Sequence, residues 1–94
     1  MTPVSLTGRL VCATRADADL VEQLLPDHIA LTRAEPGCLS FAVMRRIDEP
    51  LVWDVDELFD GEGSFRAHQA RVAASEWGRR TAAIRRDYVV VGLG

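Results

Sequence analysis

Two amino acids are missing from this chain. Its 94 residues include no lysine, so all eleven basic side chains are arginines, and they include no asparagine. Both missing residues have A/T-rich codons and alanine is abundant, so a GC-rich genome explains both gaps. The chain also lacks a hydrophobic run long enough to span a membrane, and Met1–Arg9 lacks the apolar segment of a signal peptide. We therefore expect a cytoplasmic protein with no membrane partner.

Cysteine is scarce as well. Cys12 and Cys38 follow no disulfide or metal-ligand spacing, so we expect free, buried thiols and no metal site. The formal net charge of -3 argues against nucleic acid as a partner. A content of 48% hydrophobic and 27% charged residues is typical of globular proteins. The length predicts a single domain over residues 1–94 with one modest core.

The stretch Glu35–Phe41 divides a helical pattern from a strand pattern. Pro36 cannot donate a backbone hydrogen bond and disfavours helical geometry at the residue before it, so a helix must end here. Gly37 can adopt the left-handed conformation that suits a sharp reversal. From Cys38 onward the side chains alternate with a period of two, which indicates a strand.

The whole chain predicts two strand–helix–strand units. The expected elements are a strand Leu6–Thr14, a helix capped by Asp17 or Asp19 and ending near Ala34, strands Cys38–Arg46 and Leu51–Phe59, a helical run after a cap at Ser64, and a strand Tyr88–Val91. This order predicts an α+β protein with the ferredoxin-like split βαββαβ fold, in which both helices cover one face of a four-stranded antiparallel sheet. The other face would be bare, so we expect a homodimer in which two sheet faces pack together.

Two residues are expected to interrupt the helices. Pro26 removes one backbone hydrogen bond, so it should bend the first helix or begin a second segment. Gly78 would divide the second helical run into two short helices. His28 lies at the edge of the apolar stripe of the first helix, and it is either a boundary histidine or a residue that faces a ligand.

Alternation predicts which strand side chains are buried. On the second strand it places Leu39, Phe41 and Val43 on one face. On the third strand it places Glu57 on the apolar face that also holds Trp53 and Phe59. A carboxyl group in that setting is either paired with an arginine or has a raised pKa.

Four arginines crowd the end of the second helical run: Arg79, Arg80, Arg85 and Arg86. Cations at a helix C-terminus complement the helix dipole and are typically solvated. The alternative is that one of them reaches an anionic substrate or a subunit partner.

Three motifs together carry a family resemblance: the run Glu35–Phe41, Glu57 in the third strand, and the run Phe65-Arg66-Ala67-His68. With these motifs the chain resembles the antibiotic biosynthesis monooxygenase (ABM) domain, from about Leu6 to Val91. The resemblance implies a dimeric α+β barrel. Characterised members of this family include quinone-forming monooxygenases that use no metal or flavin, and haem-degrading enzymes. It therefore implies that the protein needs no cofactor.

The resemblance also implies a pocket between the sheet and the helices. An electron-rich phenol or anthrone, once deprotonated, can pass an electron to oxygen itself, so the protein need only bind it, accept a proton and exclude water. His68 matches the family's helix histidine and is the candidate catalytic base, and a structural histidine is the alternative. The candidate substrate-binding residues are Trp53, Glu57, Phe59, Phe65 and Trp77, although the aromatic ones also suit an ordinary core and Glu57 a structural role.

The chain departs from the family pattern at several positions. Phe59 stands where the family often has tryptophan, and Arg71 and Val72 stand near the position of a common Ser-Pro pair. Haem-degrading relatives rely on an asparagine, which this chain lacks, and on a second helix histidine, where Gly78 stands here. The missing asparagine and the missing second histidine argue against haem degradation, and Phe59 and the missing asparagine also favour a domain without catalysis.

Three functional interpretations follow. The first is a cofactor-independent monooxygenase that oxidises a small polycyclic aromatic phenol, anthrone or hydroquinone to a quinone. The second is a non-catalytic dimeric domain of the same fold that binds a small molecule or is associated with stress. The third is an isomerase or lyase of the related dimeric barrels, which requires a carboxylate or histidine facing the pocket.

Overall fold

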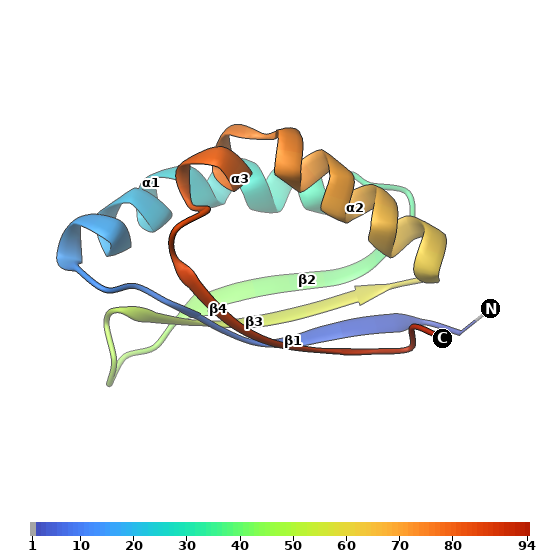
Figure 1. The fold of residues 1–94 in the computed structure, drawn as a ribbon, viewed down its shortest axis with the longest axis horizontal. Coiled ribbons are helices and arrows are strands. Elements are labelled where there is room, and N and C mark those ends of the chain that lie inside the picture. Colours follow the sequence, from blue (N-terminus) through green and yellow to red (C-terminus); the bar gives the residue numbers. More distant parts are fainter. Residues whose placement is uncertain (1) are drawn as a thin grey trace.

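The fold is a four-stranded sheet with three helices on one face (Figure 1). The computed structural model describes residues 2–94. The elements in chain order are β1 (Val4–Val11), α1 (Arg15–Arg33), β2 (Cys38–Arg45), β3 (Val52–Phe59), α2 (Glu62–Ala74), α3 (Glu76–Arg80) and β4 (Arg85–Val91).

The strand order is β2-β3-β1-β4, and every neighbouring pair is antiparallel. This arrangement confirms the predicted ferredoxin-like α+β fold, because the two strand–helix–strand units interleave in one sheet. The central strands β1 and β3 pair from Val4 opposite Phe59 to Val11 opposite Val52. The edges are β2 and β4, and β4 is longer than the predicted strand Tyr88–Val91.

The first helix begins earlier than predicted. Its N-cap is Thr14, whose hydroxyl accepts a hydrogen bond from the backbone N–H of Asp17 at 3.2 Å, so the expected cap at Asp17 or Asp19 is wrong. A helix through Pro26 continues unbroken to Arg33, because one missing N–H costs a single backbone hydrogen bond. It ends before Pro36 as expected.

The second helical run divides at Ser75, and the prediction of a break at Gly78 is wrong. Ser75 has an extended backbone and caps α3 by accepting a hydrogen bond from the N–H of Gly78. Gly78 sits within α3, where an added Cβ would collide with the carbonyl oxygen of Val72. The start of α2 also differs from the prediction, since its N-cap is Gly61 and not Ser64.

The core lies between the sheet and the helices. Trp53, Val55, Glu57 and Phe59 of β3 are all buried on the helix-covered face, as alternation predicts. On β2 the prediction fails at Leu39, which is 57% exposed. A β-bulge between Cys38 and Ser40 adds one residue to this strand, so the alternation before and after it is out of phase.

The other face of the sheet has no helix over it (Figure 1). Exposed apolar side chains on this outer face come from both edge strands: Leu39, Met44, Val89 and Val91. Charged residues lie between them. Arg9 of β1 stands opposite Asp54 of β3 on one side and opposite Asp87 of β4 on the other. No helix among residues 2–94 has the length and hydropathy needed to cross a membrane.

Candidate functional site

His68 lies on α2 and points toward the sheet. Only 2% of its surface is exposed, and it packs against Phe59 at a ring-centroid distance of 4.8 Å and against Phe41 at 6.0 Å. These aromatic contacts fix the plane of the imidazole and exclude water from it. The helix therefore presents one buried titratable ring to the space above β3.

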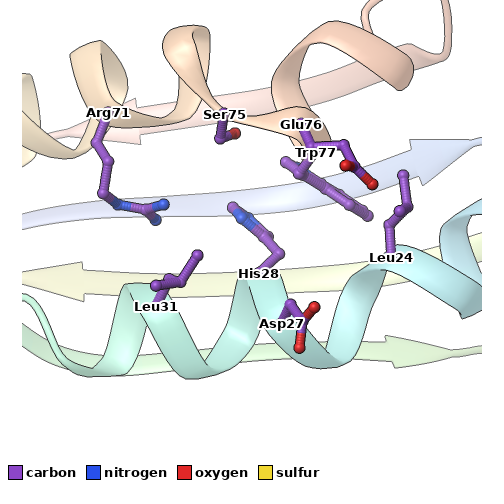
Figure 2. Close-up of a pocket in the computed structure, with 8 residues that line it drawn as sticks. All are labelled: Leu24, Asp27, His28, Leu31, Arg71, Ser75, Glu76 and Trp77. Atoms are coloured by element: carbon purple, nitrogen blue, oxygen red, sulfur yellow. The ribbon is translucent and has the colours of Figure 1, made fainter.

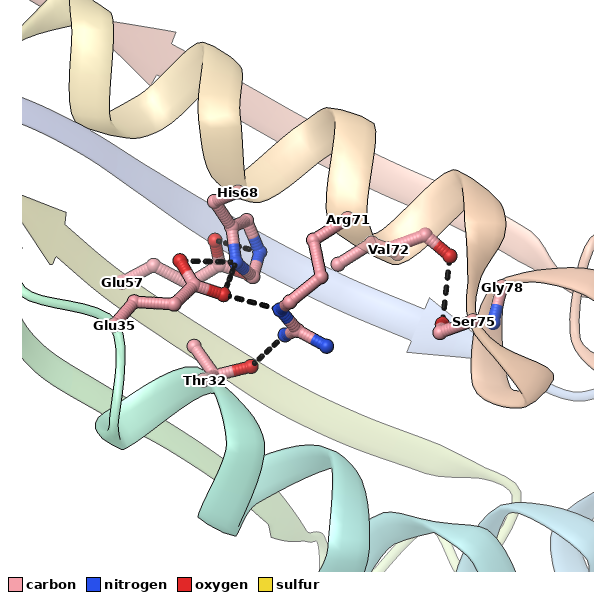
Figure 3. A network of polar contacts seen from close by, with 8 residues as sticks. All are labelled: Thr32, Glu35, Glu57, His68, Arg71, Val72, Ser75 and Gly78. Atoms are coloured by element: carbon pink, nitrogen blue, oxygen red, sulfur yellow. Dashed lines mark hydrogen bonds and ion pairs between the residues drawn. The ribbon is translucent and has the colours of Figure 1, made fainter.

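The carboxylate of Glu35 holds the Nδ1 side of this ring. Its two oxygens lie 3.0 and 3.2 Å from His68 Nδ1 (Figure 3). Arg71, one turn along α2, donates from Nε to the same carboxylate at 2.6 Å and from its terminal nitrogen to Thr32 Oγ1 at 2.9 Å. Because Glu35 can only accept, we assign the His68 proton to Nδ1, which leaves the lone pair on Nε2.

Glu57 faces the free side of the same ring. Its Oε1 lies 3.6 Å from His68 Nε2, just beyond hydrogen-bond distance, and has no hydrogen-bond partner in residues 2–94. The sequence left open whether Glu57 pairs with an arginine, and no ion pair in the described chain joins it to one. His68 thus stands between two carboxyl groups, one bonded to it and one facing it.

Burial shifts the pKa values of both groups toward their neutral forms. Desolvation, with smaller contributions from Glu35 and Asp56, raises the pKa of Glu57 from 4.5 to about 7. Desolvation lowers the pKa of His68, while its hydrogen bond to Glu35 opposes that change. Near neutral pH, a proton added beside Nε2 can therefore be held by either His68 or Glu57. Such a pair can accept a proton from a bound acid.

His28 on α1 is the second buried histidine of the site. It is 5% exposed and stacks on Trp77 of α3, with ring centroids 4.5 Å apart and an angle of 8° between the planes (Figure 2). Its Nδ1 is buried with no hydrogen-bond partner in the described part of the chain. Burial lowers the pKa of His28 from 6.5 to about 3, with smaller contributions from His68 and Arg71. The ring is therefore neutral at neutral pH.

Two spaces meet at the His28–Trp77 pair. A surface hollow of about 150 Å³ lies between α1 and α3, beside Leu24 and Leu31 (Figure 2). An inner cavity of about 60 Å³ lies between the sheet and the helices; its walls include Leu10, His28, Val55, Glu57, His68 and Tyr88. A space of about 10–15 Å³ open to a water-sized sphere holds one water molecule, so the inner cavity is large enough for water.

The predicted site residues divide into two groups. His68, Glu57 and Trp77 all line the inner cavity. Phe59 and Phe65 are not among its lining residues. Their ring centroids lie 5.8 Å apart, and Phe59 also packs against His68. Trp53 also lies apart from the cavity, buried beneath the guanidinium of Arg45 at 4.9 Å.

Sequence reasoning missed Glu35, Arg71 and Arg86 as residues of the site. In the sequence Glu35 belongs to a motif that ends a helix and carries the family resemblance, but neither signal predicts that its side chain bonds to His68. Arg71 lies three residues after His68, a helical spacing that puts both on one side of α2, and this signal was available. The sequence presents Arg86 only as one of four arginines, because the predicted strand begins at Tyr88. The observed β4 begins at Arg85, and Arg86 stands in it opposite Leu10.

The two cysteines, Cys12 and Cys38, are free thiols, as expected. Burial raises the pKa of both. Within residues 2–94 no three side chains of histidine, cysteine, aspartate or glutamate converge on a point where they could hold a metal ion.

Solved structures with this fold come from several bacteria. A candidate antibiotic biosynthesis monooxygenase of Bacteroides thetaiotaomicron superposes with a TM-score of 0.80 at 15% identity, over 99% of this chain and 89% of its own. Another, of Deinococcus radiodurans, has a TM-score of 0.74 at 21% identity and covers 97% and 92% of the two chains. A protein of Mycobacterium tuberculosis has a TM-score of 0.72 at 22% identity and covers 99% and 96%. At these identities the likeness establishes the fold alone.

Sequence comparison identifies the family. A search of curated protein sequences found no match. The sequence profile of the antibiotic biosynthesis monooxygenase family, by contrast, matches residues 10–80, which is most of the chain. The matched range includes the Glu35 loop, Glu57, His68 and Arg71, whereas Arg86 and Tyr88 of β4 lie beyond it. The chain belongs to the antibiotic biosynthesis monooxygenase family.

Proposed function

We propose that this protein is a cofactor-independent monooxygenase that oxidises a small polycyclic aromatic phenol, anthrone or hydroquinone to a quinone. The observation that carries the proposal is the buried ring of His68, held at Nδ1 by Glu35 and free at Nε2 beside an inner cavity. Membership of the family supports the same class of reaction.

The reaction needs no electron donor besides the substrate. When an anthrone reacts with O2, one oxygen atom replaces the two hydrogens of the ring CH2 as a carbonyl and the other leaves as water. A phenol with a free ring position reacts in the same proportions, whereas a hydroquinone gives its two electrons and two protons to O2 as hydrogen peroxide. In each case loss of a proton makes the ring electron-rich enough to reduce oxygen. The protein's contribution is therefore a base in a dry, shaped space.

His68 is the base in this proposal. Its Nε2 takes the substrate proton, and the resulting imidazolium is stabilised by the Glu35 carboxylate that already accepts from Nδ1. Arg71 fixes that carboxylate from the other side. Glu57, facing Nε2, can hold the same proton in turn. Trp77 contributes an aromatic wall, while Trp53, Phe59 and Phe65 would act on the substrate through the packing of the site.

We also propose that the protein is a homodimer formed through the outer face of the sheet. The exposed fractions of Met44, Val89 and Val91 are 69%, 62% and 62%, and a second copy would cover them. The charged row of Arg9, Asp54 and Asp87 would then have to pair across the interface. A solution mass equal to one 10.4 kDa chain would contradict the dimer. A cytoplasmic location likewise remains a prediction.

A second candidate function is a binding domain without catalysis. The observation that favours it is the size of the inner cavity, about 60 Å³, which is smaller than a cavity of roughly 150 Å³ that binds benzene in another protein. In this alternative the side chains of the protein fill most of the space that a substrate would use. The polar network then serves to hold α1, α2 and β3 together.

Oxygen uptake distinguishes the two functions. The metal-stripped protein is assayed with a panel of anthrones, naphthols and hydroquinones beside a His68→Ala variant. We expect uptake above the spontaneous rate and a loss of tenfold or more in the variant, which is at least ~1.4 kcal/mol of barrier. Gln23→Ala, exposed on α1, serves as the control and should retain the rate. The absence of uptake with every compound would favour the binding domain.

A further inference from the structure

Arg86 carries a charge that no carboxylate balances. It lies on the inward side of β4, half-buried, and donates to the carbonyl oxygens of Thr81 at 2.7 Å and Ile84 at 3.0 Å. Its other terminal nitrogen donates to Thr81 Oγ1 at 2.8 Å. All three partners are neutral, and none of the ion pairs found within residues 2–94 includes Arg86. A guanidinium whose partners are all neutral can still form a charge-assisted hydrogen bond, so Arg86 is a candidate partner for an anion.

Arg86 stands at the mouth of the inner cavity. The cavity walls formed by α1 and β3 are buried, with His28 at 5% and Glu57 at 6% exposure. On the opposite side the lining residues are open to solvent: Gln69 of α2 is exposed, and Arg86 and Tyr88 of β4 are partly exposed. The cavity therefore opens between α2 and the edge strand β4.

Two of the residues that line the cavity each hold a buried polar atom without a partner in the described chain. These atoms are His28 Nδ1 and Glu57 Oε1, and both belong to residues more than nine-tenths buried. The two residues line the cavity from α1 and from β3. A buried polar atom without a hydrogen bond is costly, and a ligand that offers one would relieve that cost.

The titratable groups around Arg86 leave it as the one permanent charge on the cavity wall, among the residues that the structure describes. Burial raises the pKa of Tyr88 to about 12 and raises that of the Cys12 thiol, so both stay protonated at neutral pH. His28 stays neutral because burial lowers its pKa to about 3. Of the remaining groups, His68 favours its neutral form because burial lowers its pKa, and Glu57, with a pKa raised to about 7, is neutral below that pH.

We propose that the inner cavity binds its ligand as an oxyanion, the ionised oxygen of an acidic phenol or enol, with Arg86 as its counter-ion. The ligand oxygen enters between α2 and β4 and faces Arg86, while the rest of the ring system extends out of the mouth past Gln69 and Tyr88. A cavity of about 60 Å³ is large enough for that oxygen and the adjoining atoms. This inference shares with the proposed function the inner cavity as the binding site. It does not require that the ligand be oxidised.

The probe for this site is 4-nitrophenol, because its phenolate absorbs visible light and it titrates near neutral pH. We expect the wild-type protein to lower the pKa of the bound probe by about one unit, since a cation within 4–6 Å favours the charged form. That shift corresponds to roughly tenfold tighter binding of the phenolate than of the phenol. The methyl ether 4-nitroanisole, which cannot ionise, should bind at least tenfold more weakly than the phenolate.

The variants separate charge from structure. Arg86→Gln should abolish the shift in the probe's pKa, whereas Arg86→Lys, which keeps the charge, should retain most of it. Arg79→Gln is the matched control and should retain all of it, because Arg79 is exposed and donates to the carbonyl of Ala74 outside the cavity. Circular dichroism and thermal unfolding report whether each variant is folded. If Arg86→Gln unfolds, two measurements still test the inference: the shift in the Arg86→Lys variant, and the binding of 4-nitrophenol and 4-nitroanisole to the wild-type protein.

Several results would overturn the inference: an unchanged pKa of the probe with wild-type protein, equal binding of 4-nitroanisole, or a folded Arg86→Gln variant that keeps the shift. Oxygen uptake is measured separately on the same samples. A lowered pKa of the probe without oxygen uptake would sustain the oxyanion site and reject the oxygenase. If wild-type protein does not shift the pKa of the probe, and oxygen uptake survives Arg86→Gln, the oxygenase is supported and the oxyanion site is rejected.

Discussion

The two buried histidines of this protein face one cavity but differ in their partners. His68 has a carboxylate on Nδ1 at 3.0 Å and a carboxyl oxygen 3.6 Å from Nε2. His28 has an unpartnered Nδ1 and an indole ring stacked on its face. Both rings are at most 5% exposed, so burial alone does not distinguish them.

The difference lies in what each ring can do with a proton. Desolvation lowers the pKa of both, but only His68 has a carboxylate that opposes the change. A proton on His68 is therefore compensated, whereas a proton on His28 is not. The neighbouring carboxyl groups therefore suit His68 to the proposed role of base, whereas His28 remains neutral. Removing these neighbours one at a time tests the comparison.

The largest expected effect comes from Glu57→Gln. The pKa of Glu57 is raised from 4.5 to about 7 in the folded protein, so the folded state binds this proton more tightly than the unfolded chain does. The resulting stability is complete below about pH 4.5 and is lost as the pH rises through about 7. The uncharged glutamine avoids that loss, and the variant should gain about 3 kcal/mol relative to wild type between about pH 4 and about pH 9.

Urea unfolding at both pH values measures this gain. Glu62→Gln is the matched control: Glu62 is exposed and its pKa is lowered by the hydrogen bond to Arg66, so its removal should give no gain at high pH. Equal stability differences for Glu57→Gln at the two pH values would show that Glu57 is ionised or solvated throughout. Glu57 could then not share a proton with His68 near neutral pH.

A smaller effect is expected from Glu35→Gln, which removes the charged partner of His68 and Arg71. Hydrogen bonds to charged groups contribute roughly 1.5–3 kcal/mol, so we expect the free energy of unfolding at neutral pH to fall by about 2 kcal/mol. The pKa of His68, followed by NMR of its ring protons, should fall further because Glu35 raises it. The pKa of His68 would then lie nearer to the low pKa of His28.

The control for this variant is Glu22→Gln. Glu22 pairs with Arg45 at 3.2 Å but its side chain is 67% exposed, so its loss should change stability by less than about 0.5 kcal/mol. Similar losses for Glu22→Gln and Glu35→Gln would mean that the carboxylate of Glu35 is no more important than a surface charge.

The smallest expected effect comes from His28→Phe. Phenylalanine keeps a flat ring against Trp77 and removes the unpartnered Nδ1, so the free energy of unfolding should rise by about 1 kcal/mol. The same substitution at His68 should lower it, because Glu35 would lose a donor inside the protein. Denaturation of the two variants side by side tests this difference in sign. A loss of stability in both would show that His28 has a polar role like that of His68.

The fold was predictable because its signals are local. The alternation in β3, the helix stop at Pro36 and the order of elements gave the strand–helix–strand units and hence the sheet. The errors have local causes too: the bulge before Ser40 changes the phase of β2, and the hydroxyl of Ser75 breaks the second helix where glycine was expected to. Bulges and caps depend on single hydrogen bonds, which periodicity does not reveal.

The site was only half predictable. Family resemblance identified His68 and Glu57, and alternation placed Glu57 on the buried face. Glu35 lies in a turn, where no periodicity specifies the direction of a side chain, so its bond to His68 could not be foreseen. The same holds for the stacking of His28 on Trp77, which joins elements from the two halves of the chain.

The bond between Glu35 and His68 joins residues 33 positions apart, and that between Thr32 and Arg71 joins residues 39 apart. The ends of such long loops come together only after an entropic cost that local helix formation does not carry. During refolding, the helices should therefore form before the proton-binding properties of His68 appear. Protonation of this ring would then report the docking of the two halves of the chain. A fragment that ends before α2 would contain Glu35 but not His68.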